Sequence, residues 1–314
     1  MTLNPQVQQL LEKLNSRAAP SMAEQTVCEA REAFAKMCKM LSKPEEIAKV
    51  DDRKIPGFQN ELSIRIYSPE QPTPLPCLVY FHGGGWVIGD LDTHDPLCRS
   101  IANKAECIVV SVDYSLAPES KFPVAVMDAY QSVQWVCDHV EELAIDPARL
   151  AVGGDSAGGN LAAVVCYLAH QRKGPAISYQ MLFYPSTGFQ FTPSYEKYGE
   201  GYHLTKATMK WFRQQYLSDH ADLKNPMAAP LLIPNEVTPM LPPAYILTAE
   251  YDPLRDGGLE YAEKLKNAGV KTRYICYPGM IHGFLNMTEA LDDGKRAIAE
   301  AAEALKCHFA ANYC

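Results

Sequence analysis

Short apolar runs recur along the chain from about Leu62, and stretches of helical periodicity separate most of them. The runs cover residues 62–67, 78–81, 108–112, 150–153, 179–184, 245–248 and 273–276. A strand that is apolar on both faces belongs to a sheet that helices cover on both sides, and helical crossovers make such a sheet largely parallel. The pattern therefore predicts an α/β fold.

One of these strands runs directly into a serine flanked by glycines. The strand at 150–153 is followed by a Gly-Asp-Ser-Ala-Gly run centred on Ser156, and residues 161–169 have the composition of a buried helix. On such a corner only small neighbours let strand and helix approach, and the serine hydroxyl would stand above the carboxyl edge of the sheet. The pattern predicts a nucleophile elbow. A glycine-rich turn that merely packs a helix on a strand is the alternative.

A second motif, a run of three glycines, could supply backbone amide donors beside the serine nucleophile. The strand at 78–81 runs into His82 and then into three consecutive glycines, the last two being Gly84 and Gly85. Three glycines cost backbone entropy and offer no side chains for packing, so their bare amides are expected to have a use. Acyl transfer builds negative charge on a carbonyl oxygen, which preorganised amides stabilise. We expect Gly84, Gly85 and Ala157 to form this oxyanion hole, with a flexible surface loop as the alternative.

A base and an orienting acid are available at the ends of two later strands. Asp252 stands just past the strand at 245–248, and His282 lies in a loop after the strand at 273–276. The nucleophile needs a general base, and the base needs a third group to orient it. The chain order Ser156, Asp252, His282 is the order found in α/β-hydrolases.

Other roles stay open at these positions. Asp252 precedes Pro253, so it would also suit a helix N-cap, and Glu250 is the next candidate acid. His82 is the rival base, although its place before the glycines better suits a role in shaping that loop. Asp155, beside the serine, is expected to be structural.

Together these motifs give the chain a clear resemblance. It resembles the hormone-sensitive-lipase-like carboxylesterases, also called bacterial family IV esterases, from about Leu62 to the C-terminal helix. The matching blocks are His82-Gly83-Gly84-Gly85-Trp86, Val112-Asp113-Tyr114-Ser115-Leu116-Ala117-Pro118-Glu119, Gly154-Asp155-Ser156-Ala157-Gly158-Gly159-Asn160, Asp252-Pro253-Leu254-Arg255-Asp256 and His282-Gly283-Phe284. The resemblance implies an α/β-hydrolase fold with a mostly parallel eight-stranded sheet flanked by helices and carrying a helical cap.

The resemblance also implies a site and exposes two departures. The family's triad falls on Ser156, Asp252 and His282, and its oxyanion donors fall on Gly84, Gly85 and Ala157. The family usually has arginine where Ser115 stands and glutamate where Gly257 stands. Neither position belongs to the triad, so we expect these departures to affect local ion pairing and stability.

Two segments lie outside the strand–helix alternation. The N-terminal stretch to about Pro44 is helical, with Val7, Leu10, Leu11 and Leu14 on one face, and the segment 186–243 is rich in aromatic residues and contains a helix at about 205–217. We expect the two to pack together as a cap over the serine, although the aromatics would also suit plain core packing. The predicted organisation is an N-terminal part of the cap (1–45), a core (46–185), a cap insertion (186–243) and the rest of the core (244–314).

The predicted chemistry is hydrolysis of carboxylic esters through an acyl-enzyme, without a metal or organic cofactor. The resemblance favours acyl chains from acetyl to roughly octanoyl, and Trp86, Tyr184 and Tyr202 are the expected substrate contacts. A receptor that uses the pocket of a hydrolase scaffold to bind a ligand without turnover is the alternative from another class. The strand near Arg273 and Cys276 is a candidate sheet edge, and therefore a candidate homodimer contact.

Composition limits the partners and the compartment. The 314 residues are 47% hydrophobic, with a net charge of −8, a pI near 5.5 and no basic stripe, so a nucleic-acid partner is not expected. No apolar stretch is long enough to span a bilayer. The ten cysteines are scattered singly and no apolar leader follows Met1. We therefore expect reduced thiols in a cytoplasmic protein.

Overall fold

The computed structural model describes residues 2–16 and 20–311. The strands are β1 (Lys49–Pro56), β2 (Glu61–Ser68), β3 (Leu75–Phe81), β4 (Ile108–Asp113), β5 (Ile145–Asp155), β6 (Tyr179–Phe183), β7 (Ala244–Tyr251) and β8 (Thr272–Ile281). The α-helices are α1 (Pro5–Asn15), α2 (Val27–Leu41), α3 (Leu91–Ala105), α4 (Val124–Asp138), α5 (Ala157–Arg172), α6 (Pro193–Tyr198), α7 (Lys206–Tyr216), α8 (Arg255–Asn267) and α9 (Asp292–Ala311). Short 3₁₀ turns, η1 (Met22–Glu24), η2 (His220–Lys224), η3 (Pro230–Leu232), η4 (Thr238–Met240) and η5 (Phe284–Asn286), connect some of them.

A single eight-stranded sheet organises the molecule, in the order β1-β2-β4-β3-β5-β6-β7-β8. The ladders from β4 to β8 are all parallel, whereas β2 runs antiparallel to both β1 and β4. All seven predicted strands are present. β1 was not among them, because this edge strand buries only Ile55 and most of its other residues are charged, so it lacks an apolar run.

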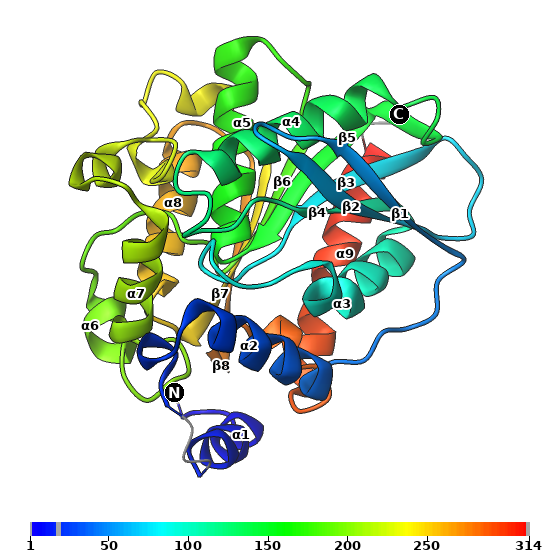
Figure 1. The fold of residues 1–314 in the computed structure, drawn as a ribbon. Helices are drawn as coiled ribbons and strands as arrows, with labels where there is room; N and C mark the ends of the chain where they lie inside the picture. Colours follow the sequence, from blue (N-terminus) through cyan, green and yellow to red (C-terminus); the bar gives the residue numbers. More distant parts are fainter. Residues whose placement is uncertain (1, 17–19, 312–314) are drawn as a thin grey trace.

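Helices cover both faces of this sheet, as predicted. One core packs α4, α5 and α8 against residues such as Val79 and Val152, and the other packs α3 and α9 against residues such as Tyr80 and Ala151. Neighbouring residues of one strand thus enter opposite cores, which is the period of two that a strand imposes. Figure 1 shows the sheet between the two layers of helices.

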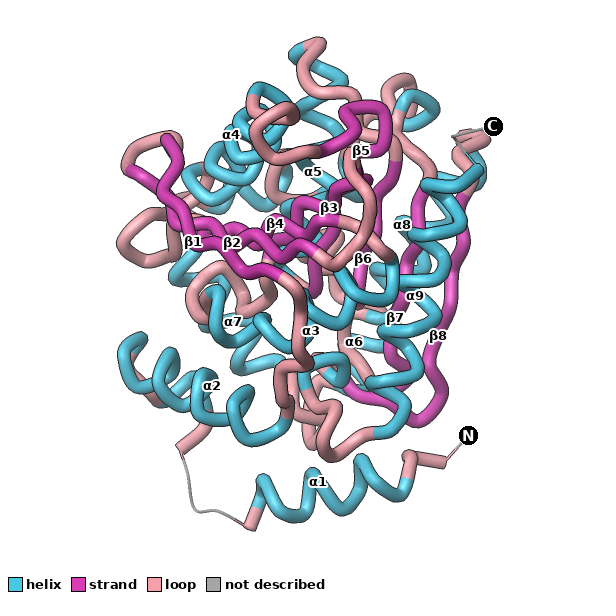
Figure 2. The backbone as a smooth tube through the Cα atoms, turned by 90° about the vertical axis from the view of Figure 1, so that its right-hand side faces the viewer, coloured by secondary structure: helices cyan, strands magenta, loops and turns pink. Residues whose placement is uncertain are grey.

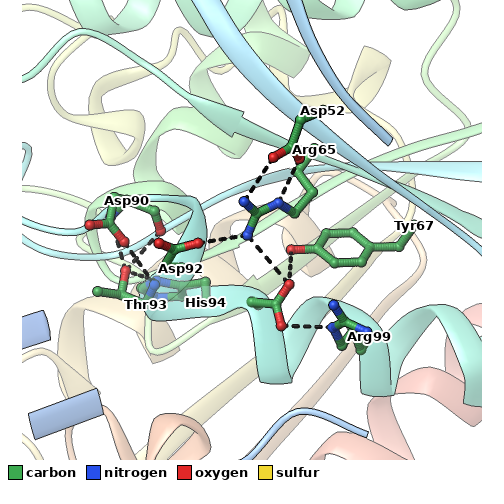
Figure 3. Close-up of polar contacts among 9 residues, drawn as sticks. Asp52, Arg65, Tyr67, Asp90, Asp92, Thr93, His94 and Arg99 are labelled. Atoms are coloured by element: carbon green, nitrogen blue, oxygen red, sulfur yellow. Dashed lines mark hydrogen bonds and ion pairs between the residues drawn. The ribbon is translucent and has the colours of Figure 1, made fainter. Parts of the chain in front are cut away.

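A charged network fastens α3 to the antiparallel edge of the sheet (Figure 3). Arg65 on β2 donates two hydrogen bonds, of 2.7 and 2.9 Å, to Asp52 on β1, and one of 2.7 Å to Asp92 on α3. Tyr67 and Arg99 both donate to Asp95, at 2.9 and 2.7 Å. Since α3 is the first helix after the glycine loop at 83–85, this network also stabilises the element that follows that loop.

The two segments outside the alternation lie at one end of the molecule, where α2 is next to α7 in both views (Figures 1 and 2). In α1, Val7, Leu10 and Leu11 are buried as predicted, and Leu14 is half-buried. The later part of the insertion, through η3 and η4, contacts α8. Among the described helices, none combines the length and apolar character needed to cross a bilayer.

Candidate active site

Ser156 occupies a sharp corner between β5 and α5. Its backbone has φ 55° and ψ −114°, a conformation that L-residues rarely adopt and that functional sites often retain. The corner is possible because Gly158 has no side chain: a Cβ at this position would overlap the carbonyl oxygen of Phe81 on β3. The amide of Ser186 donates to the carbonyl oxygen of Ser156 at 3.1 Å, which ties the start of the insertion to the same corner.

His282 and Asp252 form a hydrogen-bonded chain with this serine. The Nε2 atom of His282 lies 2.9 Å from Ser156 Oγ, and its Nδ1 atom lies 2.7 Å from Asp252 Oδ2. A carboxylate only accepts hydrogen bonds, so Nδ1 carries the proton and the lone pair of Nε2 faces the hydroxyl. Asp252 is fully buried and His282 is 8% exposed. The structure thus brings together the three residues that the sequence singled out.

The geometry distinguishes Asp252 from Glu250, the other candidate acid, and His282 from His82, the rival base. Asp252 also accepts a hydrogen bond from the amide of Leu254 at 2.8 Å through its other oxygen, so it orders the turn before α8 while it contacts His282. Glu250 instead accepts from the amide of Gly279 at 2.8 Å. The ring of His82 is buried, stacks on Tyr114 with centroids 4.4 Å apart, and bonds to the carbonyl of Gly83 at 2.7 Å. Burial, and then nearby His94, lower the pKa of His82 to about 4.

The glycine loop lines the same cavity as His282. Gly84 and Gly85 have φ values of 119° and 59°, and both line the cavity that contains Ser156 and Ala157. A Cβ at Gly84 would overlap the carbonyl oxygen of Ile88, and one at Gly85 would overlap the ring of Phe212 on α7. Glycine is therefore required at both positions by the backbone and by space.

Asp155 holds the glycine loop in place through hydrogen bonds. Its Oδ1 atom accepts hydrogen bonds from Tyr80 at 2.8 Å and from the amide of Gly83 at 2.9 Å, and it lies 3.1 Å from His94 Nε2. Burial of Asp155 opposes ionisation, but the interactions with His94 and Tyr80 outweigh it and lower the pKa. Asn286, four residues after His282, contacts His94 at 3.1 Å. Asp155 is thus structural, as expected.

A cavity of about 770 Å³ opens above Ser156. Its floor contains Ser156, Ala157, Gly84, Gly85 and His282. The N-terminal segment and the insertion supply most of the walls, including Leu14, Met22, Phe34, Met37, Met40, Phe189, Phe191, Tyr195, His203, Met209 and Phe212. Such a volume with apolar walls and few polar groups is typical of a small-molecule site.

The three expected substrate contacts have different positions. Trp86 lines the cavity and stacks on Tyr216, with centroids 4.3 Å apart and planes inclined by 3°. Tyr184 is fully buried with its ring 4.8 Å from that of His282, and Tyr202 packs on Tyr198 and Tyr251. Both tyrosines belong to the described residues, and neither lines the cavity. Of the three, only Trp86 is placed where it could contact a substrate in this cavity.

Three residues of the cavity wall were not expected there from the sequence. His203 has a left-handed backbone (φ 75°), and burial followed by the charge of His282 lowers its pKa to about 4. Thr187 and Gly257 meet at another point of the wall. No motif marks His203 or Thr187, whereas the departure at Gly257 was visible in the sequence. Within residues 2–16 and 20–311, no three histidine, cysteine or acidic side chains gather as they would around a metal ion.

The fold and the arrangement of this site define an α/β hydrolase, and comparison with known proteins agrees. Residues 78–286 match the family model described as alpha/beta hydrolase fold. The chain is 40% identical to the carboxylic ester hydrolase LipN of Mycobacterium tuberculosis (98% of this chain, 84% of LipN). It is 37% identical to an ethyl acetate hydrolase of Pseudomonas putida (98% and 100%).

Solved structures give the same result. An ester hydrolase from the Lake Arreo metagenome, in complex with a bipyridine phosphonate derivative, superimposes with a TM-score of 0.95 at 41% identity over 98% of this chain and 100% of that one. A hyperthermophilic esterase of Pyrobaculum calidifontis has a TM-score of 0.93 at 41% identity (98% and 99%). The chain belongs to the α/β-hydrolase family, among its hormone-sensitive-lipase-like carboxylesterases, and it is a carboxylic ester hydrolase.

Proposed function

We propose that the protein hydrolyses short- to medium-chain acyl esters by a two-step Ser-His-Asp mechanism. Ser156 Oγ attacks the ester carbonyl while His282 Nε2 takes its proton, and the oxyanion binds the amides of Gly84, Gly85 and Ala157. His282, oriented by Asp252, then donates that proton to the leaving alcohol. Water repeats the sequence on the acyl-enzyme and releases the acid.

The observation that carries this proposal is the chain Asp252–His282–Ser156 at the floor of a cavity. Its two contacts of 2.7 and 2.9 Å have the length and order that a nucleophile, base and orienting acid require. The glycine loop supports it, because Gly84 and Gly85 line the same floor and have no side chains that would cover their amides.

The first experiment is hydrolysis of p-nitrophenyl esters from acetate to palmitate by the wild type and Ser156→Ala. We expect turnover to peak at short to medium chains and to be abolished in the variant, while Ser178→Ala, a serine outside the cavity, retains it. If no ester is turned over, labelling of Ser156 by a fluorophosphonate would indicate a reactive nucleophile with another substrate. A ligand that binds without labelling or turnover would favour a receptor instead.

The pH profile gives a second test of the base. The proposed mechanism requires a neutral His282, so kcat/KM should rise with pH as this imidazole loses its proton. A flat profile between pH 5 and 8 would contradict the assignment of His282 as the base.

We further propose that residues 1–45 and 186–243 act together as the cap that sets acyl-chain preference. Wall residues such as Phe34 and Phe189, one from each segment, support this role. A deletion or proteolytic cut in either segment that left the chain-length profile unchanged would refute it.

Two finer proposals concern assembly and compartment. β8 is the edge strand of the sheet and Arg273 is exposed on it, which supports a homodimer through this edge; a monomer in light scattering at micromolar concentration would contradict it. The nine cysteines in the described part of the chain are free thiols, which supports a cytoplasmic location. Cell fractionation tests this location directly.

A further inference from the structure

One corner of the cavity wall is polar and takes no part in the proposed acyl transfer. It is formed by Thr187, Gln190 and Gly257, which line the same cavity as Ser156. The amide of Ser186 donates to the carbonyl oxygen of Ser156 at 3.1 Å, and Thr187 is the next residue in the chain. The corner is therefore within reach of a substrate whose carbonyl lies at Ser156.

Thr187 presents a hydroxyl that lacks a protein partner. The residue is 2% exposed, and its Oγ1 atom is buried without a hydrogen bond, although its carbonyl accepts one from the amide of Leu231 at 2.9 Å. An unsatisfied buried hydroxyl costs about 1–3 kcal/mol, and most buried polar groups have partners. A hydroxyl left unpaired on a cavity wall is best explained by a partner that arrives with the ligand.

Gly257 leaves the space beside this hydroxyl free of a side chain of its own. A Cβ at position 257 would lie 3.0 Å from Thr187 Oγ1, so any longer side chain would fill the corner. The resemblance to the family predicts a glutamate at position 257, where this chain has a glycine. Gln190 does not take the space, because its Nε2 atom donates to Glu260 at 3.0 Å.

We propose that Thr187 Oγ1 bonds to a polar substituent of the substrate, so that the enzyme prefers esters that carry a hydroxyl or keto group. The proposal rests on the ester hydrolysis proposed above and specifies its substrate class. A threonine hydroxyl accepts from a substrate hydroxyl and donates to a keto oxygen. One neutral hydrogen bond of this kind corresponds to about a 3- to 10-fold preference in kcat/KM.

The test compares matched esters by acid release. Ethyl 3-hydroxybutanoate against ethyl butanoate probes the acyl side, and 3-hydroxybutyl acetate against butyl acetate probes the alcohol side. We expect the hydroxylated ester to be preferred about 3- to 10-fold in one arm, and Thr187→Val to reduce that ratio to about one. Valine matches the shape of threonine, and the lost hydroxyl has no protein partner, so the variant should fold.

Two further variants sharpen the result. Gly257→Ala places a methyl group against Thr187 Oγ1 and should lower the same ratio, because it closes the corner. Thr248→Val is the matched control: this buried threonine on β7 pairs with Tyr274 at 2.8 Å and does not line the cavity, so the ratio should stay at its wild-type value.

The outcomes separate the two proposals. A wild-type ratio near one in both arms would overturn the polar subsite, and so would a preference that survives in Thr187→Val. In either case, Ser156-dependent hydrolysis of the plain esters would leave the proposed function standing. Absence of all Ser156-dependent hydrolysis would overturn both.

Discussion

The floor and the walls of the cavity are built by different means. On the floor, Ser156 is held by a strained backbone corner, His282 by a 2.7 Å bond to a fully buried Asp252, and Gly83 by a 2.9 Å bond to buried Asp155. The walls consist mainly of Met, Leu and aromatic side chains from the N-terminal segment and the insertion.

This difference separates what catalysis requires from what specificity requires. Acyl transfer depends on atoms placed to within a fraction of an ångström, and buried, saturated hydrogen bonds provide that precision. Substrate selection depends on volume and on a few polar contacts, so apolar packing suffices for it. Substitutions on the floor should therefore reduce kcat, and substitutions on the walls should change the preference among substrates.

The largest effect is expected at Asp252. Asp252→Asn replaces the acceptor facing His282 Nδ1 with an amide that favours the wrong tautomer, so kcat should fall about 10³- to 10⁴-fold with little change in folding. Steady-state kinetics on p-nitrophenyl butyrate measure this loss. The matched control is Glu250→Gln, since Glu250 contacts the amide of Gly279 instead of His282. An equal loss in both variants would contradict the assignment of the acid.

The next effect is expected below the glycine loop. Asp155→Ala removes the shared acceptor of Tyr80 and the Gly83 amide and also removes the acidic partner of His94, which should cost about 3–5 kcal/mol of unfolding free energy. The kcat should fall as well, because the loop loses its support. Tyr80→Phe removes one of these bonds and should cost about 1 kcal/mol in the same urea titration. Equal costs would show that Asp155 does not organise the network.

The floor was predictable from sequence because its requirements are local. A strained corner requires glycines beside Ser156, and amide donors require bare backbone at Gly84 and Gly85, so each demand is visible in a short motif. The parallel strands were predictable for a similar reason, since burial on both faces produces an apolar run. β1 was not, because one face of this edge strand meets solvent and its charged residues resemble a loop.

The walls were not predictable at the level of single residues. The amphipathic face of α1 was correctly identified, but which aromatic residue of the insertion faces the cavity depends on long-range packing. Tyr184 and Tyr202 illustrate this: the first lies against His282 and the second packs on Tyr198 and Tyr251, away from the cavity. Thr187 lies in no motif, and the burial of its hydroxyl without a partner is a property of the folded chain alone.

A third effect is expected at a second hollow, outside the active-site cavity, where α2 contacts the core. Arg31 on α2 bonds to the carbonyl of Val87 at 2.9 Å and forms an ion pair with Glu119 at 2.7 Å, beside a hollow of about 400 Å³ that Asp113 and Ser115 also line. Burial, and then the charge of Asp90, raise the pKa of Asp113 to about 6, while Lys54 and Arg65 act in the opposite direction. Ser115 offers no charge where the family resemblance predicts an arginine.

The sign of the pH effect follows from that raised pKa. Between about pH 4 and 6 the folded state holds a proton on Asp113 that the unfolded chain has released, so stability should fall as pH rises through this window. Asp113→Asn should therefore stabilise the protein by about 2 kcal/mol at pH 8 and by nothing near pH 4, measured by urea unfolding. Exposed Asp138→Asn is the control. A pH-independent difference would contradict the interpretation.

The smallest effect on stability, and the sharpest contrast with the floor, is expected at the cavity mouth. Phe191 lines the cavity but is 71% exposed, and its ring makes an edge contact with Tyr195 at 5.1 Å. Phe191→Ser should change the unfolding free energy by less than about 0.5 kcal/mol, because little apolar area leaves a buried site. The ratio of KM for octanoate to KM for acetate esters should rise about 2- to 5-fold, since only a longer chain reaches the mouth. Leu232→Ser, an equally peripheral substitution at a residue that is 48% exposed and outside the cavity, should leave that ratio at its wild-type value. A fall in kcat with an unchanged KM ratio would mean that this wall residue affects catalysis and not substrate preference. The assignment of catalysis to the floor and of substrate selection to the walls would then be wrong.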